Sequence, residues 1–168
     1  MKRTANVSHC GQYRYNLTRE WDDTRARVLF IMLNPSTADA NVDDPTIRRC
    51  IRFACDWGFG SLEVVNLSPI RSTDPKGLLS RTPEQKRADG FSYRTNAYEI
   101  EMAGERAALI IQAWGANKAV KELGMGWRMF EQRQHLYAIV RRLGSTKDLS
   151  PKHPLYVPSA AVPVDVWR

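Results

Sequence analysis

Short apolar runs alternate along the chain with stretches of helical spacing. Residues 27–33 are continuously apolar after the first position, and residues 62–67 and 108–113 form short runs that are mostly apolar. Such runs are typical of strands buried on both faces of a parallel sheet. Residues 12–19 instead alternate between apolar and polar positions, which predicts a strand with one covered face.

The clearest helix signal follows the first apolar run. Asp44 is a favourable N-cap, Pro45 suits the first helical turn, and apolar residues recur at helical spacing over residues 47–54. Gly58 is a suitable residue for the C-terminal end, where glycine commonly stops a helix. The pattern therefore predicts a helix that begins after Asp44 and ends before Gly58.

Weaker patterns complete the expected order of elements. Helices are predicted over about 95–105 and 127–141, followed by a short strand before Pro151. Residues 70–93 contain prolines and glycines among many charges, which indicates a long loop. Because strands that alternate with helices favour right-handed crossovers, we expect one α/β domain over residues 1–168. Its expected form is a three-layer α/β/α sandwich with a mostly parallel central sheet.

Polar residues follow the predicted strands, at the edge where α/β sheets bind ligands. Asn34 ends the first apolar run and is followed by Pro35 and Ser36, which form either a plain turn or a cradle for a ligand. Asn66 is an amide at the end of an otherwise apolar strand. A buried amide must be paired, either within the protein or by a ligand such as the edge of a base.

Two later segments offer further candidates for ligand contact. Trp114 and Gly115 end the third apolar run, where the tryptophan is either core or ligand contact and the glycine permits a tight turn or a close backbone approach. His153 lies between two prolines and can donate to a developing anion, while Lys152 can meet a phosphate. Tyr156 in the same segment is a third candidate. The alternative for His153 is an ordinary surface histidine.

Two carboxylates precede the predicted helix. Helix capping is the commoner role for Asp44, which leaves Asp43 as a candidate general base. Asp39 has the same ambiguity. Ordinary surface carboxylates remain the alternative for both.

The charge of the chain favours a phosphate-rich partner. The formal net charge is +7 and the isoelectric point is near 9.6, and cationic surfaces bind nucleic acids through counterion release. Candidate contacts are Arg48, Arg49, Lys118 and Lys147. We expect DNA or a nucleotide as partner and no obligate protein partner, although a basic surface can also serve solubility alone.

The composition limits the other classes of function. No stretch approaches the roughly 18 apolar residues of a membrane span, and no apolar run follows the basic N-terminus, so we expect a cytoplasmic protein without a membrane partner. Cys10, Cys50 and Cys55 lack metal-ligand spacing and are expected to be free thiols. We expect no metal and no cofactor, because the phosphate-binding and dinucleotide signatures are absent.

Segments spread over nearly the whole chain are similar to one family. They are Tyr13-Arg14-Tyr15, residues 31–38, Asp43-Asp44-Pro45-Thr46 with Arg48-Arg49-Cys50, Val65-Asn66-Leu67, Ala113-Trp114-Gly115 and residues 152–156. On these segments the chain is identified as a member of the family with domain of unknown function 1643, which occurs in bacteria and their phages. This resemblance implies no activity.

Four of these positions also resemble the uracil-DNA glycosylase superfamily in their order along the chain. They are Asn34-Pro35, Asn66, Trp114-Gly115 and His153-Pro154. This resemblance implies a uracil-DNA-glycosylase-like fold and an N-glycosidic hydrolase that acts on a base in DNA, including a modified one. By it, Asn34 would position the attacking water, Asn66 would pair with the flipped base, and His153 would stabilise the negative charge on the leaving base.

The chain departs from that superfamily at several positions. Ser36 stands where a stacking aromatic residue is expected, and residues 155–157 replace the usual continuation of the terminal loop. With an amide at position 34, a general base has to come from elsewhere, such as Asp43 or Asp39. Two alternatives therefore stay open: a non-catalytic nucleic-acid- or nucleotide-binding module on the same scaffold, and a small-molecule enzyme of bacterial or phage metabolism.

Overall fold

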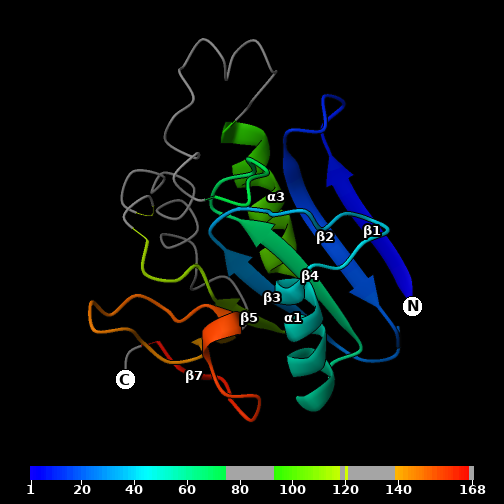
Figure 1. Ribbon diagram of the computed structural model, residues 1–168. Helices are drawn as coiled ribbons and strands as arrows, with labels where there is room; N and C mark the ends of the chain where they lie inside the picture. The colour runs from blue at the N-terminus through cyan, green and yellow to red at the C-terminus, as the bar shows by residue number, and fades with distance from the viewer. Residues whose placement is uncertain (75–92, 118–119, 121–138, 167–168) are drawn as a thin grey trace.

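The computed structural model describes residues 1–74, 93–117, 120 and 139–166, which build one mixed sheet with an α-helix on each face (Figure 1). The strands lie in the order β1-β2-β4-β3-β5-β6-β7. In chain order the elements are β1 (Lys2–Val7), β2 (Arg14–Glu20), β3 (Arg27–Met32), α1 (Pro45–Asp56), β4 (Ser61–Asn66), α3 (Tyr93–Arg106), β5 (Leu109–Gln112), β6 (Ile139–Arg142), the short 3₁₀ helix η3 (Pro154–Tyr156) and β7 (Val164–Asp165). The α/β class is confirmed.

The strands do not run mostly parallel. β4, β3, β5 and β6 are parallel neighbours, but β1–β2, β2–β4 and β6–β7 pair antiparallel. The expectation of a mostly parallel sheet is therefore wrong. One cause is the connection between β2 and β3, which spans only residues 21–26 and reverses the chain direction, because parallel strands need a longer crossover.

The continuously apolar character of β3 reflects burial on both of its faces. Phe30 belongs to the same apolar cluster as Phe53 of α1. Leu29 and Ile31 belong to the cluster on the opposite face, together with Ile100 of α3. Successive side chains of a strand point to opposite faces, so a strand between two helices needs apolar residues at every position.

The predicted helix before Gly58 is confirmed, together with both of its ends. The Asp44 carboxylate accepts a hydrogen bond from the Ile47 N–H at 2.8 Å, which caps α1. At the other end Gly58 has a φ of +83°, a conformation that favours glycine. The Phe59 N–H then bonds the Ala54 carbonyl at 2.9 Å, which completes a Schellman motif.

Other elements differ from the expectation. α3 confirms the helix predicted over about 95–105, whereas residues 139–142, partly assigned to the end of a helix over 127–141, form strand β6. Residues 121–138 and most of the predicted loop at 70–93 lie outside the described residues. β1 and β7 were not predicted, because these edge strands lack a buried apolar alternation. No helix within the described ranges is long and apolar enough to cross a membrane.

Candidate functional site

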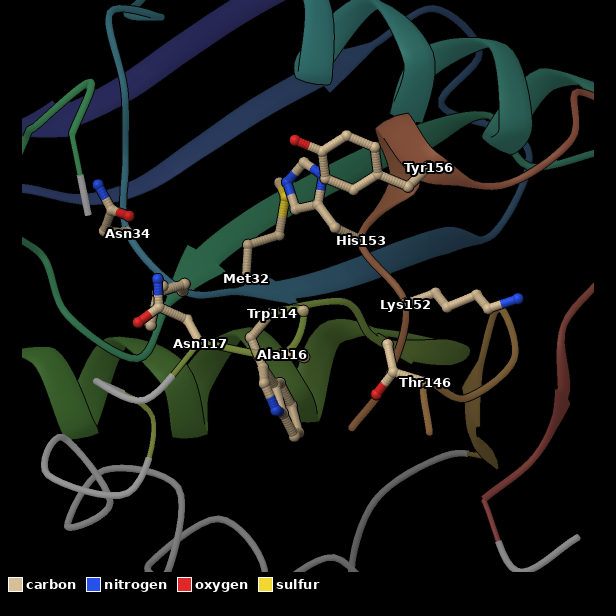
Figure 2. Close-up of a pocket in the computed structure, with 11 residues that line it drawn as sticks. Met32, Asn34, Trp114, Ala116, Asn117, Thr146, Lys152, His153 and Tyr156 are labelled. Carbon is tan, nitrogen blue, oxygen red and sulfur yellow. The ribbon is translucent and has the colours of Figure 1, made fainter. Parts of the chain in front are cut away.

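Two adjoining cavities lie where the parallel strands end. The larger one, here called the outer cavity, has a volume of about 480 Å³, and the smaller one, here called the polar chamber, about 190 Å³. They share Met32, Asn34 and His153. The outer cavity is further lined by Leu33, Trp114, Gly115, Ala116, Asn117, Thr146, Lys152 and Tyr156 (Figure 2). The polar chamber is further lined by Arg14, Ser36, Asp44, Thr46, Ile47, Asn66, Ser72 and Thr73.

The amide of Asn34 is held in one orientation by backbone carbonyls. Its Nδ2 donates to the Pro35 carbonyl at 3.0 Å and to the Ser72 carbonyl at 2.8 Å. Only the nitrogen can face two acceptors, so the assignment of the two amide atoms follows from the contacts. The oxygen is then left as an acceptor, and Figure 2 shows it turned toward the side of the cavity where His153 lies.

The contacts of His153 define its tautomer. The Leu155 N–H donates to Nδ1 at 3.3 Å, so this nitrogen carries no proton and Nε2 is the donor of the neutral ring. Burial lowers the pKa of His153 below its ordinary value of 6.5, and the nearby Asp44 carboxylate opposes that shift. His153 is therefore a neutral hydrogen-bond donor at neutral pH.

Gly115 brings the segment after β5 against the histidine. Its N–H donates to the Pro151 carbonyl at 3.0 Å, and its φ is +76°. A Cβ at this position would lie 3.5 Å from the Cβ of His153. The left-handed backbone accounts for glycine here, because a Cβ at 3.5 Å would make only an ordinary van der Waals contact with His153.

Asn66 and Arg14 form the inner wall of the polar chamber. Asn66 is 1% exposed, and its Oδ1 accepts from the Arg14 Nη2 at 3.3 Å. Arg14 is 2% exposed and also donates from Nη1 to the Ala38 carbonyl at 2.8 Å. The Asn66 Nδ2 and the Arg14 Nε are buried and find no hydrogen-bond partner among the described residues. Two donors are thus available for a ligand with acceptor atoms.

The two carboxylates before α1 have different surroundings. Asp43 lines neither cavity, because its carboxylate is bound by the buried Arg19 at 2.7 Å and by Arg3 at 3.0 Å. Asp44 lines the polar chamber and is the one carboxylate among the described lining residues of the two cavities. Sequence reasoning assigned Asp43 to catalysis and Asp44 to capping, but a carboxylate has two oxygens and can cap a helix while facing a cavity.

The aromatic residues of the outer cavity differ in exposure. Trp114 is 7% exposed and belongs to the apolar cluster on the α3 face, and Figure 2 shows its indole directed away from His153. Tyr156 is 80% exposed, with its ring 5.7 Å from the His153 ring. The side chain of Lys152 points away from Asn34 in the same view. Tyr156 is therefore the aromatic surface that a ligand can reach at the mouth of the cavity.

The remaining predicted contacts are spread over the surface and the core. Arg49 donates to the Val157 carbonyl at 2.6 Å and lies over the Phe53 ring, which joins η3 to α1. Arg48 donates to the Asp43 carbonyl, and Lys147 is exposed on the turn beside Thr146. Lys118 lies outside the described residues.

The turn after β3 supplies a hydroxyl to the site. Ser36 lines the polar chamber. Pro35 is buried behind it, where its carbonyl accepts from the Ser72 N–H at 2.9 Å. The turn therefore presents Ser36 to a ligand and holds Asn34 through backbone contacts.

The thiols and potential metal ligands do not converge on the site. Cys10 and Cys55 are exposed, Cys50 is buried in the apolar cluster that includes α1, and none of the three forms a disulfide within the described residues. In the part of the chain that the structure describes, no three His, Cys, Asp or Glu side chains gather as potential metal ligands.

Comparison with known proteins places the chain in a sequence family. A family model described as a protein of unknown function (DUF1643) matches residues 14–155. The match includes Arg14, Asn34, Asp44, Asn66 and His153. The chain has no match among curated proteins or solved structures.

Proposed function

We propose a function for this chain, which belongs to the DUF1643 family of proteins of unknown function, from the geometry of its cavity: it binds a nucleobase and hydrolyses its N-glycosidic bond. The proposed substrate is a base in DNA, including a modified one. The observation that carries the proposal is the convergence of three groups on one polar chamber. They are an oriented acceptor at Asn34, a neutral donor at His153, and an amide donor at Asn66 that has no partner among the described residues.

The three side chains match the needs of base recognition and departure. The Asn66 Nδ2 donates to a carbonyl oxygen of the base, in place of the partner that it lacks within the described residues. In this proposal the His153 Nε2–H donates to the departing base anion and stabilises its charge. A neutral donor suits this role, because its hydrogen bond strengthens as negative charge develops on the base. This supports a donor role for His153 in the transition state.

We assign the attacking water and its proton to Asn34 and Asp44. The Asn34 Oδ1 accepts from the attacking water and orients it toward the sugar carbon. Asp44 takes the proton that this water loses, while the departing base keeps the electron pair of the broken carbon–nitrogen bond and later gains a proton from solvent. Because Asp44 lines the chamber and Asp43 is bound by two arginines, Asp44 is the better candidate for the base.

The surroundings of the cavity fit a nucleic-acid substrate. Tyr156 offers an exposed ring on which a neighbouring base can stack. The net charge of +7 favours phosphates. We include a uracil-DNA-glycosylase-like architecture in the proposal. It agrees with the order along the chain of Asn34-Pro35, Asn66, Trp114-Gly115 and His153-Pro154.

The alternative is a nucleotide-binding module without turnover. The observation that favours it is the amide at position 34, because an amide orients water but cannot accept its proton. The hydrolase needs Asp44 to accept a proton, whereas the binding module carries out no reaction and does not need this role of Asp44.

A panel of DNA oligonucleotides with different modified bases tests the proposal. We expect at least one base to be released, as measured by mass spectrometry of the free base and by alkaline cleavage at the resulting abasic site. Asp44→Asn keeps a good N-cap, so the fold survives while the rate falls by about 10²–10⁴-fold. Asp39→Asn is the matched control, because Asp39 lines neither cavity and asparagine can still accept from the Asn41 and Val42 N–H groups. Binding of base-containing DNA with no release of any base contradicts the hydrolase and favours the binding module.

A further inference from the structure

Two buried arginines on the same strand differ in how their charges are balanced. Arg19 is 0% exposed and forms an ion pair with Asp43 at 2.7 Å. Arg14 is 2% exposed, but no carboxylate among the described residues forms an ion pair with it. Among the described residues its guanidinium donates only to the Ala38 carbonyl and to the Asn66 Oδ1. Arg14 therefore carries a buried charge with no bound counter-charge in this part of the chain.

Such a charge is costly unless something compensates it. Burial lowers the pKa of Arg14 from 12.5 to about 10, and the negative charge of Asp44, which lines the same chamber, only partly offsets this effect. The guanidinium is still protonated at neutral pH. A buried cation without a counter-ion costs far more than a buried neutral group, so its occurrence beside a cavity points to an anionic ligand.

The hydrogen-bonding capacity of the wall points the same way. Because Arg14 donates to the Asn66 Oδ1, the amide nitrogen is the group of Asn66 that is left for a ligand. The Nδ2 of Asn66 and the Nε of Arg14 are both buried donors without a partner among the described residues. Ser36 and Thr46 also line this space and carry hydroxyl groups, whereas the Ser72 hydroxyl already donates to the Asp74 carbonyl at 2.7 Å. This set is rich in donors and suits a ligand group with several acceptor oxygens.

We propose that Arg14 and Asn66 form an oxyanion subsite of the polar chamber, which takes an acidic group carried by the ligand. The location of this subsite in the polar chamber does not depend on any reaction. That the ligand's ring is a nucleobase rests on the proposed function. On that function, the preferred substrate is a base that bears a carboxylate. A nucleotide phosphate offers the same chemistry, and the test separates these two sources.

Calorimetric titration of the full chain with free ligands tests the subsite. The probes are uracil, uracil-5-carboxylate, uracil-6-carboxylate, uridine 5′-monophosphate, acetate and inorganic phosphate. We expect one of the two carboxylates to bind at least about tenfold tighter than uracil, because a charge-assisted hydrogen bond is added. Arg14→Met should remove this preference. Arg71→Met should keep it, because Arg71 is a nearby cation that lines neither cavity.

The outcomes distinguish the subsite from the proposed function. Equal binding of uracil and both carboxylates overturns the subsite and leaves the base pocket standing. If acetate, phosphate or the monophosphate binds in a way that depends on Arg14, and no free base binds, the ligand of the subsite is another anion. That result supports the subsite and counts against a nucleobase as the ligand. Binding of no anion overturns the subsite, since water alone then satisfies the two donors. The comparison of probes on the unaltered chain needs no variant, so a failure of Arg14→Met to fold does not prevent the test.

Discussion

Replacement of Asp43 by alanine should destabilise the fold without acting at the cavity. The carboxylate is 11% exposed and binds Arg19, whose side chain is 0% exposed, so its removal leaves a buried guanidinium without its counter-charge. Removing one partner of a buried ion pair costs about 3–5 kcal/mol. We expect a value near 3 kcal/mol, at the lower end of that range, because Arg19 keeps its bonds to the Thr18 and Asp39 carbonyls at 2.8 and 2.6 Å.

Equilibrium unfolding in urea measures this loss. For a slope of about 2 kcal/mol/M, the midpoint should fall by about 1.5 M. Arg3→Ala is the control, because Arg3 binds the same carboxylate but is 38% exposed, and an exposed pair contributes less than about 1 kcal/mol. An unchanged midpoint for Asp43→Ala, together with loss of base release, would refute the structural role and return Asp43 to the catalytic role that its position suggested.

Three further predictions concern the site. Gly115→Ala should lower the unfolding free energy by about 1–2 kcal/mol, because φ is +76°, while Gly115→Asn should cost less; equal effects in urea unfolding would refute the backbone argument. Tyr156→Ala should leave stability unchanged and weaken DNA binding by about 5–150-fold in fluorescence anisotropy, since the ring is 80% exposed; unchanged affinity would exclude stacking. The pKa of His153 is lowered in the folded chain, so the unfolded chain gains a proton on this histidine first as pH falls through about 6.5. The free energy of unfolding should therefore decrease between pH 6.5 and the folded pKa of His153. Below the folded pKa this histidine should cause no further decrease. His153→Gln should remove this pH dependence in thermal unfolding, and a pH dependence equal to that of the unaltered chain would contradict it.

Local signals were enough to predict the central elements. The apolar run of β3 is decided by burial on both faces, and α1 by its cap, its proline and Gly58, so each signal lies within the segment that it determines. The direction of β2, in contrast, is not determined by residues within that strand. It depends on a short connection to β3 and on pairing with β4, which is distant in sequence. Strand alternation alone cannot specify that pairing.

In the candidate site, too, residues with a local signal were predicted, and a residue whose burial depends on distant contacts was not. Asn34, Asn66 and His153 were found because they follow strands or interrupt apolar segments, and the structure brings them to one chamber. Arg14 was missed because an arginine in an alternating strand is typical of the exposed face. Its burial depends on the turn that carries Ala38 and on Asn66, neither of which is a neighbour in sequence. Asp44 was missed because its capping role already explained it.

The kinetic effect of His153→Ala on base release separates a catalytic role of His153 from a role in binding alone. Single-turnover release from the most reactive DNA and the dissociation constant for the same DNA are measured on one preparation. We predict a rate lower by about 10²–10³-fold with affinity within a few fold, because the donor acts on charge that exists only in the transition state. Loss of affinity at an unchanged rate, or an unaltered rate and affinity, would contradict a catalytic role for His153.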